Sequence, residues 1–249
     1  MKIYTYYQNI NHSSQNELID LWKISWSRQG YEPIVLNLED AKKHSYFETL
    51  NTEMRRIFKE ITNKEIDKYG MSCWFRWLAY ATQEDEKFYV SDYDAINYNF
   101  PITEPSNTLH LMDGHVPCFA SGTPIQFENL CKAFVEVSIE RIEILKQQAN
   151  HYHDQEFFHF NFVSEWNPLS EKLRNQHGIL MTRNRNEFGG YIDPVENKIC
   201  EGEKYIENQK YGVVHVSHRS IEILQEKYAK YKKQDVNQLR IDIIKNLLK

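Results

Sequence analysis

Hydrophobic positions in the first half of the chain follow two alternating patterns. Short, nearly continuous apolar runs are followed by longer segments in which apolar residues recur at intervals of three and four. The first pattern is typical of buried strands and the second of amphipathic helices. The expected strands are 2–7, 32–36, 88–90 and 109–112, and the expected helices are 16–27, 45–61, 67–81 and 124–145. Because strands and helices alternate, we predict an α/β fold with a parallel-type sheet and helices on both faces.

The second half of the chain has a less regular pattern. We expect a helix at 154–162, strands at 179–182 and 211–216, and a polar turn at 184–190. A charged helix to about residue 232 and an amphipathic helix carrying Leu239, Ile241, Ile244 and Leu248 complete the chain. We therefore predict a single catalytic domain over 1–220 and a helical extension over 221–249, packed on that domain or on a partner.

Composition is that of a globular protein. Hydrophobic residues make up 41% and charged residues 26% of the 249 residues, which is enough chain to bury a core. The net charge of −5 argues against a general nucleic-acid binder, which needs a basic face. Sixteen tyrosines fit the recognition of sugars and bases, although a coding bias would explain them equally well.

Four scattered cysteines form no C-x-x-C pair, which suits neither a zinc knuckle nor a small disulfide scaffold and fits a reducing compartment. The N-terminal residues lack the apolar core of a signal peptide. No stretch approaches the roughly 20 apolar residues that would span a bilayer. From these features we expect a cytoplasmic protein without a membrane span.

The segment from Lys87 to Asp94 carries the densest chemical signal. An apolar strand ends in Asp92 and Asp94, two carboxylates two residues apart. In an extended chain such side chains share a face, and they would repel each other unless a cation lay between them. Carboxylate oxygens suit Mg²⁺ or Mn²⁺, which can bridge to phosphate oxygens. The alternative interpretation is a solvated acidic turn.

Two further residues add to this signal. Arg76 lies among aromatic residues on the preceding helix, where a buried guanidinium needs an anionic partner such as a phosphate or one of the two aspartates. His215 ends a late apolar strand, and neutral imidazole is a good third ligand for Mn²⁺. Taken singly, Arg76 could be a surface residue packed on Trp77, and His215 could be a packed strand histidine.

The order of these segments resembles the GT-A class of glycosyltransferases, which depend on a metal and use nucleotide-sugar donors. The shared features are an N-terminal strand, the helix spacing Ser72-x-x-x-Arg76-Trp77, an apolar strand into D-x-D, and a late V-V-H-V-S-H strand. They cover roughly residues 1–220 in order. The resemblance implies a Rossmann-related mixed sheet with a helical C-terminal region, and transfer of a sugar to a saccharide or other hydroxyl acceptor.

The resemblance also implies roles for individual residues. Asp94 would hold the metal, with Asp92 acting directly or through water and also contacting the donor ribose. His215 falls where the late metal histidine of the family lies, with His218 as a fallback or phosphate contact. The other expected donor contacts are Arg76, near the phosphate or sugar, and Tyr6, Tyr7 and Gln8, beside the base and ribose. Uridine is favoured as the base only because it is the most frequent one.

The acceptor side is expected to use loops and a short acidic stretch. Segments 113–118 and 120–123 read as loops that bind ligand. Asp154 and Glu156 resemble the acidic stretch that faces the reacting sugar, where either could act as general base. Both could instead complement the dipole at a helix N-terminus. Trp166 could stack on a sugar or belong to the core.

Two other functions stay open. A phosphohydrolase of the HAD type also carries D-x-D after an apolar strand, but its motif belongs to the first strand and needs a G-D-x-x-x-D companion. A catalytically silent nucleotide-sugar-binding protein would keep the site without turnover. Many GT-A relatives carry Gly-Gly before the D-x-D strand, whereas this chain has Gln83-Glu84-Asp85-Glu86. The P-loop, G-x-G-x-x-G and G-x-S-x-G motifs do not occur.

Overall fold

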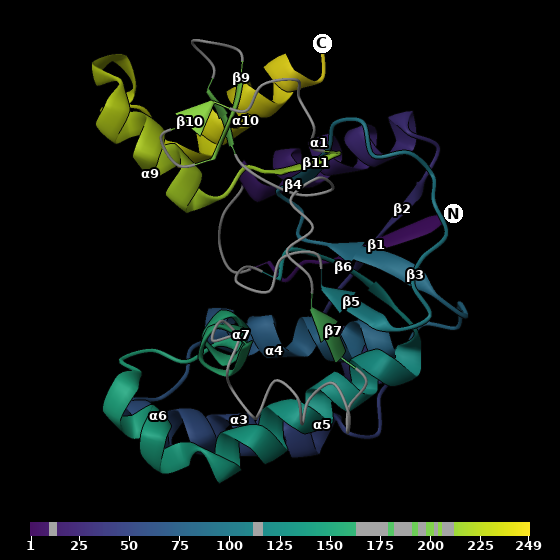
Figure 1. Ribbon diagram of the computed structural model, residues 1–249, viewed down its shortest axis with the longest axis vertical. Coiled ribbons are helices and arrows are strands. Elements are labelled where there is room, and N and C mark those ends of the chain that lie inside the picture. Colours follow the sequence, from purple (N-terminus) through teal and green to yellow (C-terminus); the bar gives the residue numbers. More distant parts are fainter. Residues whose placement is uncertain are drawn as a thin grey trace.

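A computed structural model describes most of the chain (Figure 1). The described residues are 1–9, 14–111, 117–162, 179–181, 191–193, 198–201, 204–205 and 212–249. The predicted polar turn at 184–190, most of the predicted loop at 113–118, and Trp166 lie outside them.

A six-stranded mixed sheet forms the middle layer, in the order β2-β1-β3-β6-β5-β7. Its strands are β1 (Lys2–Tyr6), β2 (Glu32–Leu36), β3 (Phe88–Ser91), β5 (Leu109–Leu111), β6 (Phe119–Gly122) and β7 (Ile179–Met181). β1 pairs in parallel with β2 and β3, and β5 pairs in parallel with β7, whereas β6 runs antiparallel to β3 and β5. The predicted α/β class and the carboxyl-end position of Asp92 and Asp94 after β3 are therefore confirmed.

Helices cover both faces of this sheet (Figure 1). They are α1 (Ser14–Arg28), α2 (Leu38–Lys42), α3 (Phe47–Thr62), α4 (Lys68–Ala81), α5 (Pro124–Glu140), α6 (Ile142–Gln148), α7 (Asp154–Phe162), α9 (His218–Lys227), α10 (Val236–Leu247) and a 3₁₀ turn at Ala229–Tyr231. The expected single helix at 124–145 is wrong. The backbone of Arg141 leaves the helical region (φ −106°, ψ 9°), so α5 ends there and α6 continues beyond it.

Alternating strand residues build two cores, one on each face of the sheet. Tyr4, Phe88 and Val90 belong to a core with residues of α2 to α7. Ile3 and Tyr89 belong to a second core with α1, α9 and α10. This period of two is what a strand buried on both faces requires. The C-terminal helices therefore pack on the sheet domain and share a core with α1.

β6 corrects one expectation. Residues 120–123 were expected to form a ligand-binding loop, but 119–122 are a buried strand between β3 and β5. The small residues Ala120, Ser121 and Gly122 gave no strand signal in the sequence. A Cβ at Gly122 would lie 3.2 Å from Leu109 Cδ1 and 3.3 Å from Leu109 Cα, so the close approach of β5 favours a small residue there.

Two small sheets lie outside the main one. β4 (Ala95–Asn97) pairs antiparallel with β11 (Val213–His215), and the register sets His215 opposite Ala95. The other sheet contains β8 (Tyr191–Asp193), β9 (Lys198–Glu201) and β10 (Lys204–Tyr205), all antiparallel. The β4–β11 pair brings the late histidine of the sequence beside the acidic turn.

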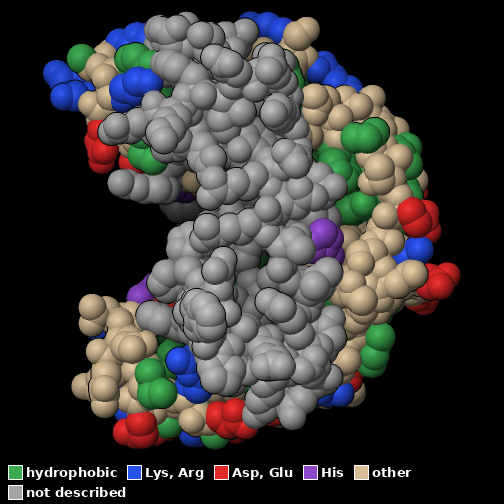
Figure 2. Space-filling view, in the orientation of Figure 1, with side chains coloured by type: hydrophobic (Ala, Val, Ile, Leu, Met, Phe, Trp, Pro, Cys, Tyr) green, Lys and Arg blue, Asp and Glu red, His purple; other side chains and the backbone are tan. Residues whose placement is uncertain are grey.

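The surface adds little to the functional picture. Within the part of the chain that the structure describes, no helix has both the length and the apolar character needed to cross a bilayer. Acidic and basic side chains are interspersed around the margin of the face drawn in Figure 2. That margin offers no continuous basic stripe of the kind that follows a phosphate backbone.

Two buried tryptophans of α1 hold the turn that contains the acidic motif. The indole of Trp22 donates to Ser91 Oγ at 2.9 Å, and the indole of Trp26 donates to the carbonyl of Ala95 at 3.1 Å. Ser91 and Ala95 flank Asp92-Tyr93-Asp94 on either side. Both indoles are fully buried, so the turn is fastened to the interior at each end.

We predict that Trp22→Phe lowers the free energy of unfolding by about 1–3 kcal/mol, because the buried Ser91 hydroxyl loses its donor while most of the apolar volume is kept. Urea unfolding measures this change. Ile24→Ala on the exposed side of the same helix is the matched control and should shift stability by no more than about 0.5 kcal/mol. Equal effects of the two substitutions would contradict the anchoring role of the indole.

Candidate functional site

Backbone hydrogen bonds from three elements fix the turn between β3 and β4. The amide of Asp92 donates to the carbonyl of Cys118 at 2.8 Å, next to the start of β6. The amide of Ala95 donates to the backbone carbonyl of Asp92 at 3.0 Å, and this bond closes the turn. After β11, the amide of Val216 donates to the carbonyl of Asp94 at 2.9 Å. The carboxylates therefore project from a backbone that is held on several sides.

Asp92, Asp94 and His215 converge as the sequence predicts. One donor atom from each lies within 4.8 Å of the others. His215 Nε2 lies 3.3 Å from Asp94 Oδ1, a contact made possible by the pairing of β11 with β4. All three side chains are partly buried, so the group has both a protein side and a solvent side. Two carboxylates and an imidazole form a donor set that suits Mn²⁺ or Mg²⁺.

Arg76 has the anionic partners that its aromatic surroundings demand. Its Nη1 donates to Asp92 Oδ1, and its Nε and Nη2 lie 2.9 Å and 2.6 Å from Asp154 Oδ2. The Trp77 indole donates to the same Asp154 oxygen at 2.7 Å, and the Arg76 guanidinium carbon lies 4.9 Å from the centre of the Trp77 ring. Arg76 therefore joins the acidic turn to the first turn of α7.

Arg240 on α10 belongs to this group of side chains, and the sequence analysis did not identify it. Its Nη2 donates to Asp94 Oδ2, and its Nε donates to the carbonyl of Val216 at 2.9 Å. The Arg240 side chain is 1% exposed. The available signal was its position one turn from Ile244, on the apolar face of an amphipathic helix, where a charge needs a partner.

The charges of the site shift several pKa values. Burial raises the pKa of Asp92 to about 6 against the opposing effect of Arg76, and the Asp94 carboxylate adds to the rise. Burial would also raise the pKa of Asp94, but His215 and Arg240 outweigh it and hold that pKa well below its usual range. Burial alone would lower the pKa of His215, yet the Asp94 carboxylate raises it. These opposite shifts identify Asp92 as the carboxylate whose negative charge is less fully compensated.

The residues at the end of β1 that were expected to contact the nucleotide-sugar donor lie on different sides of the sheet. The Tyr7 ring meets the Tyr93 ring edge-on at 5.8 Å, which places it beside the acidic turn. The Tyr7 hydroxyl is buried and finds no hydrogen-bond partner among the described residues. Tyr6 lies in the core on the opposite face and donates to Gln8 Oε1 at 3.3 Å. The structure therefore brings Tyr7, rather than Tyr6, to the turn.

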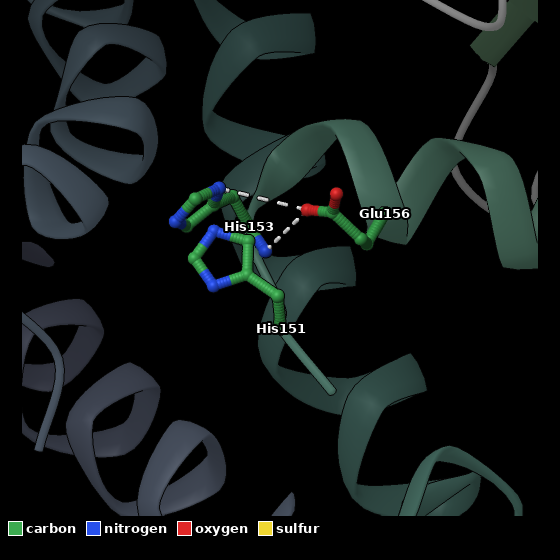
Figure 3. Close-up of side chains that lie close together, drawn as sticks. All are labelled: His151, His153 and Glu156. Atoms are coloured by element: carbon green, nitrogen blue, oxygen red, sulfur yellow. Dashed lines mark hydrogen bonds and ion pairs between the residues drawn. The ribbon is translucent and has the colours of Figure 1, made fainter. Parts of the chain in front are cut away.

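The remaining expected residues lie around this group rather than in it. His218 is exposed at the start of α9. Asp154 is 2% exposed and is held by Arg76 and Trp77. Glu156, on the same turn of α7, accepts the backbone amide of His153 at 2.8 Å and lies with His151 and His153 (Figure 3). The acidic stretch therefore divides between two neighbouring groups of side chains.

Comparison with known proteins adds no relative: no family model matches the chain, and no curated protein or solved structure matches it.

We predict that Arg240→Met destabilises the protein by about 2–4 kcal/mol, because Asp94, only 14% exposed, would lose its guanidinium partner and keep only His215. Urea unfolding measures the change, and adding Asp94→Asn to the variant should recover part of it. Arg56→Met, which removes an arginine 48% exposed to solvent, is the control and should have little effect. A double variant less stable than Arg240→Met alone would argue against the pairing.

Proposed function

We propose that the chain is a glycosyltransferase of the GT-A type, which moves a sugar from a nucleotide-diphosphate sugar to a hydroxyl acceptor. The observation that supports this best is the convergence of Asp92, Asp94 and His215 beyond the carboxyl end of β3. Open α/β sheets bind ligands at this edge. A mixed sheet with helices on both faces is consistent with the proposed fold type.

The donor atoms fit a divalent cation. Asp92 uses Oδ1 to accept from Arg76, and Asp94 uses Oδ2 to accept from Arg240 while its Oδ1 faces His215. Each arginine thus engages one oxygen and orients its carboxylate, as partners of metal ligands commonly do. Asp92, Asp94 and His215 would hold Mn²⁺ or Mg²⁺, which when bound supplies positive charge to offset the charge developing on a diphosphate leaving group.

Arg76 is the residue that we assign to the donor's phosphate or sugar. Its guanidinium lies at the same edge of the sheet as Asp92 and is held in position by hydrogen bonds to Asp154. A planar guanidinium can donate two parallel hydrogen bonds to phosphate oxygens. Its bond to Asp92 also places those donors beside the carboxylate that would hold the metal.

Tyr7 and Tyr93 are the aromatic pair that we assign to the nucleoside. Their rings meet edge-on beside the turn, where a base or ribose can pack against them. The buried Tyr7 hydroxyl lacks a partner among the described residues, and buried polar groups ordinarily have one. A ribose hydroxyl or a base carbonyl would supply it, with a uridine nucleotide as the first candidate.

Asp154 acts in this proposal as a positioning residue. One of its oxygens, Oδ2, accepts from both Arg76 and Trp77, and the side chain is almost fully buried. A carboxylate that is already the acceptor for a guanidinium is poorly suited to remove a proton from an acceptor hydroxyl. Its contribution is to hold Arg76 at Asp92. The role of Glu156 as a general base stays a prediction.

The proposed metal-dependent site predicts that a nucleotide sugar raises the Tm of the protein only when a divalent metal is present. One nucleotide sugar from a panel of UDP-, GDP- and CMP-sugars should raise Tm with Mn²⁺ or Mg²⁺ but not with EDTA. A hundredfold excess over Kd corresponds to about 2.7 kcal/mol of added stability. Asp94→Asn, checked for folding by circular dichroism, should lose this shift and any sugar transfer.

Other outcomes of the same panel would replace the proposal. Metal-dependent binding of a donor without product, across a set of saccharide acceptors, would identify a silent binding protein. Stabilisation by Mg²⁺ with a phosphate-mimicking anion, but by no nucleotide sugar, would favour a phosphohydrolase. Wild-type transfer by a folded Asp94→Asn protein would exclude the proposed metal site.

Asp154→Asn separates positioning from proton transfer. We expect the KM for the donor to rise more than kcat falls, because a looser Arg76 weakens donor binding while the chemical step is kept. Steady-state kinetics with the acceptor saturated measures both constants. A fall in kcat of about a hundredfold or more at unchanged KM, with loss of the acidic limb of the pH profile, would instead make Asp154 the general base.

A further inference from the structure

We propose that His151, His153 and Glu156 form a second metal site, for Zn²⁺ or a similar transition-metal ion, at the N-terminus of α7. Figure 3 shows the two imidazoles next to each other and the Glu156 carboxylate directed towards them. One donor atom from each residue lies within 4.8 Å of the others. The site is separate from the group at Asp92 and Asp94 and does not depend on the sugar-transfer proposal.

One pair of donor atoms already has a spacing close to that of two ligands on one ion. His153 Nδ1 lies 3.6 Å from Glu156 Oε2, whereas the His151 and His153 ring centres, 3.6 Å apart at an interplanar angle of 84°, are closer together than two imidazoles bound to one ion would be. Ligand bonds of about 2.0–2.2 Å place the donors of a tetrahedral ion about 3.4 Å apart. Binding an ion would therefore require the two imidazole rings to turn and separate, while Glu156 stays near His153.

The donor set determines which metal is preferred. Two imidazoles and one carboxylate are a recurring ligand set for zinc, with a further position left for solvent. The group at Asp92, Asp94 and His215 has the opposite balance, with two carboxylates and one imidazole. Nitrogen-rich sites favour Zn²⁺ and its neighbours, whereas oxygen-rich sites favour Mg²⁺ and Mn²⁺. The two groups should therefore differ in metal preference.

The surrounding residues hold the three ligands in place. Tyr69 meets the His153 ring edge-on at 5.9 Å, and Phe58 meets the His151 ring edge-on at 6.1 Å. Glu156 Oε2 also accepts the backbone amide of His153. This helix-capping bond explains the direction of Glu156 but not the approach of two imidazoles to each other.

The second metal site is accessible to solvent and lies where a bound ion would stabilise the start of α7. His151 is exposed and the other two side chains are partly exposed, so an ion can enter from solvent. Bound metal would tie residues before α7 to its first turn, where helices otherwise fray. Asp154 lies between the ligands in the sequence and holds Arg76. Zinc at this site would thus stabilise the segment that positions Arg76.

The test is a calorimetric titration of tag-free protein with Zn²⁺ alone, carried out in a His215→Gln background that removes the imidazole of the other group. We expect one site to remain in this background. His151→Ala should weaken its affinity at least tenfold, because even indirect partners of metal ligands contribute about 10–100-fold. Glu156→Gln should also weaken it, although the glutamine amide can keep the helix cap.

His44→Gln is the matched control, since it removes a histidine on another part of the surface that pairs with Glu128, and it should leave the affinity unchanged. Circular dichroism establishes that each variant is folded. Unchanged zinc affinity in both His151→Ala and Glu156→Gln would overturn the proposal. Loss of all zinc binding with His215→Gln alone would also overturn it and would assign the ion to the acidic turn. Retention there, with loss in His151→Ala, supports the second site even if no nucleotide sugar binds.

Discussion

The rest of the structure depends on the compensation of three carboxylates that meet at one edge of the sheet. Asp92, Asp94 and Asp154 are all partly or fully buried, and buried charges are strongly unfavourable unless they are paired. Arg76 bridges Asp92 and Asp154, and Arg240 pairs with Asp94. Because the two arginines come from α4 and the C-terminal helix α10, these ion pairs connect elements that are far apart in the sequence. The acidic turn is therefore a point of assembly as well as a candidate site.

This compensation is incomplete, which supports the proposed metal. Three carboxylates face two guanidiniums, and the raised pKa of Asp92 places the remaining excess of negative charge at Asp92. His215 can offset part of it when protonated. A cation bound by Asp92, Asp94 and His215 would offset it more fully and would also attract a diphosphate. The same imbalance thus supports the proposed metal, and the proposed anionic ligand depends on that metal.

The sequence predicted the parts of the site whose signals lie within a short stretch of residues. The alternation of strands and helices, the carboxylates at the end of an apolar strand, and an arginine among aromatics each carry a signal within a short window. β6 was not predicted because Ala120, Ser121 and Gly122 have low strand propensity, and at Gly122 the close approach of β5 favours a small residue. Arg240 was not predicted because its burial depends on a hydrogen bond to Asp94, which lies 146 residues away in the sequence. A charged side chain can be buried where it has a partner of opposite charge. A partner that is distant in the sequence produces no local pattern.

The two aspartates of the turn are connected to opposite helical layers. Asp92 is tied through Arg76 and Asp154 to α4 and α7, whose residues pack in the core on one face of the sheet. Asp94 is tied through Arg240 to α10, which packs in the core on the other face. The directions of the two carboxylates are therefore fixed from both layers, whereas the turn itself sets how far apart they start. A ligand or ion that orders the start of α7 would therefore act on the site first through Asp154, Arg76 and Asp92.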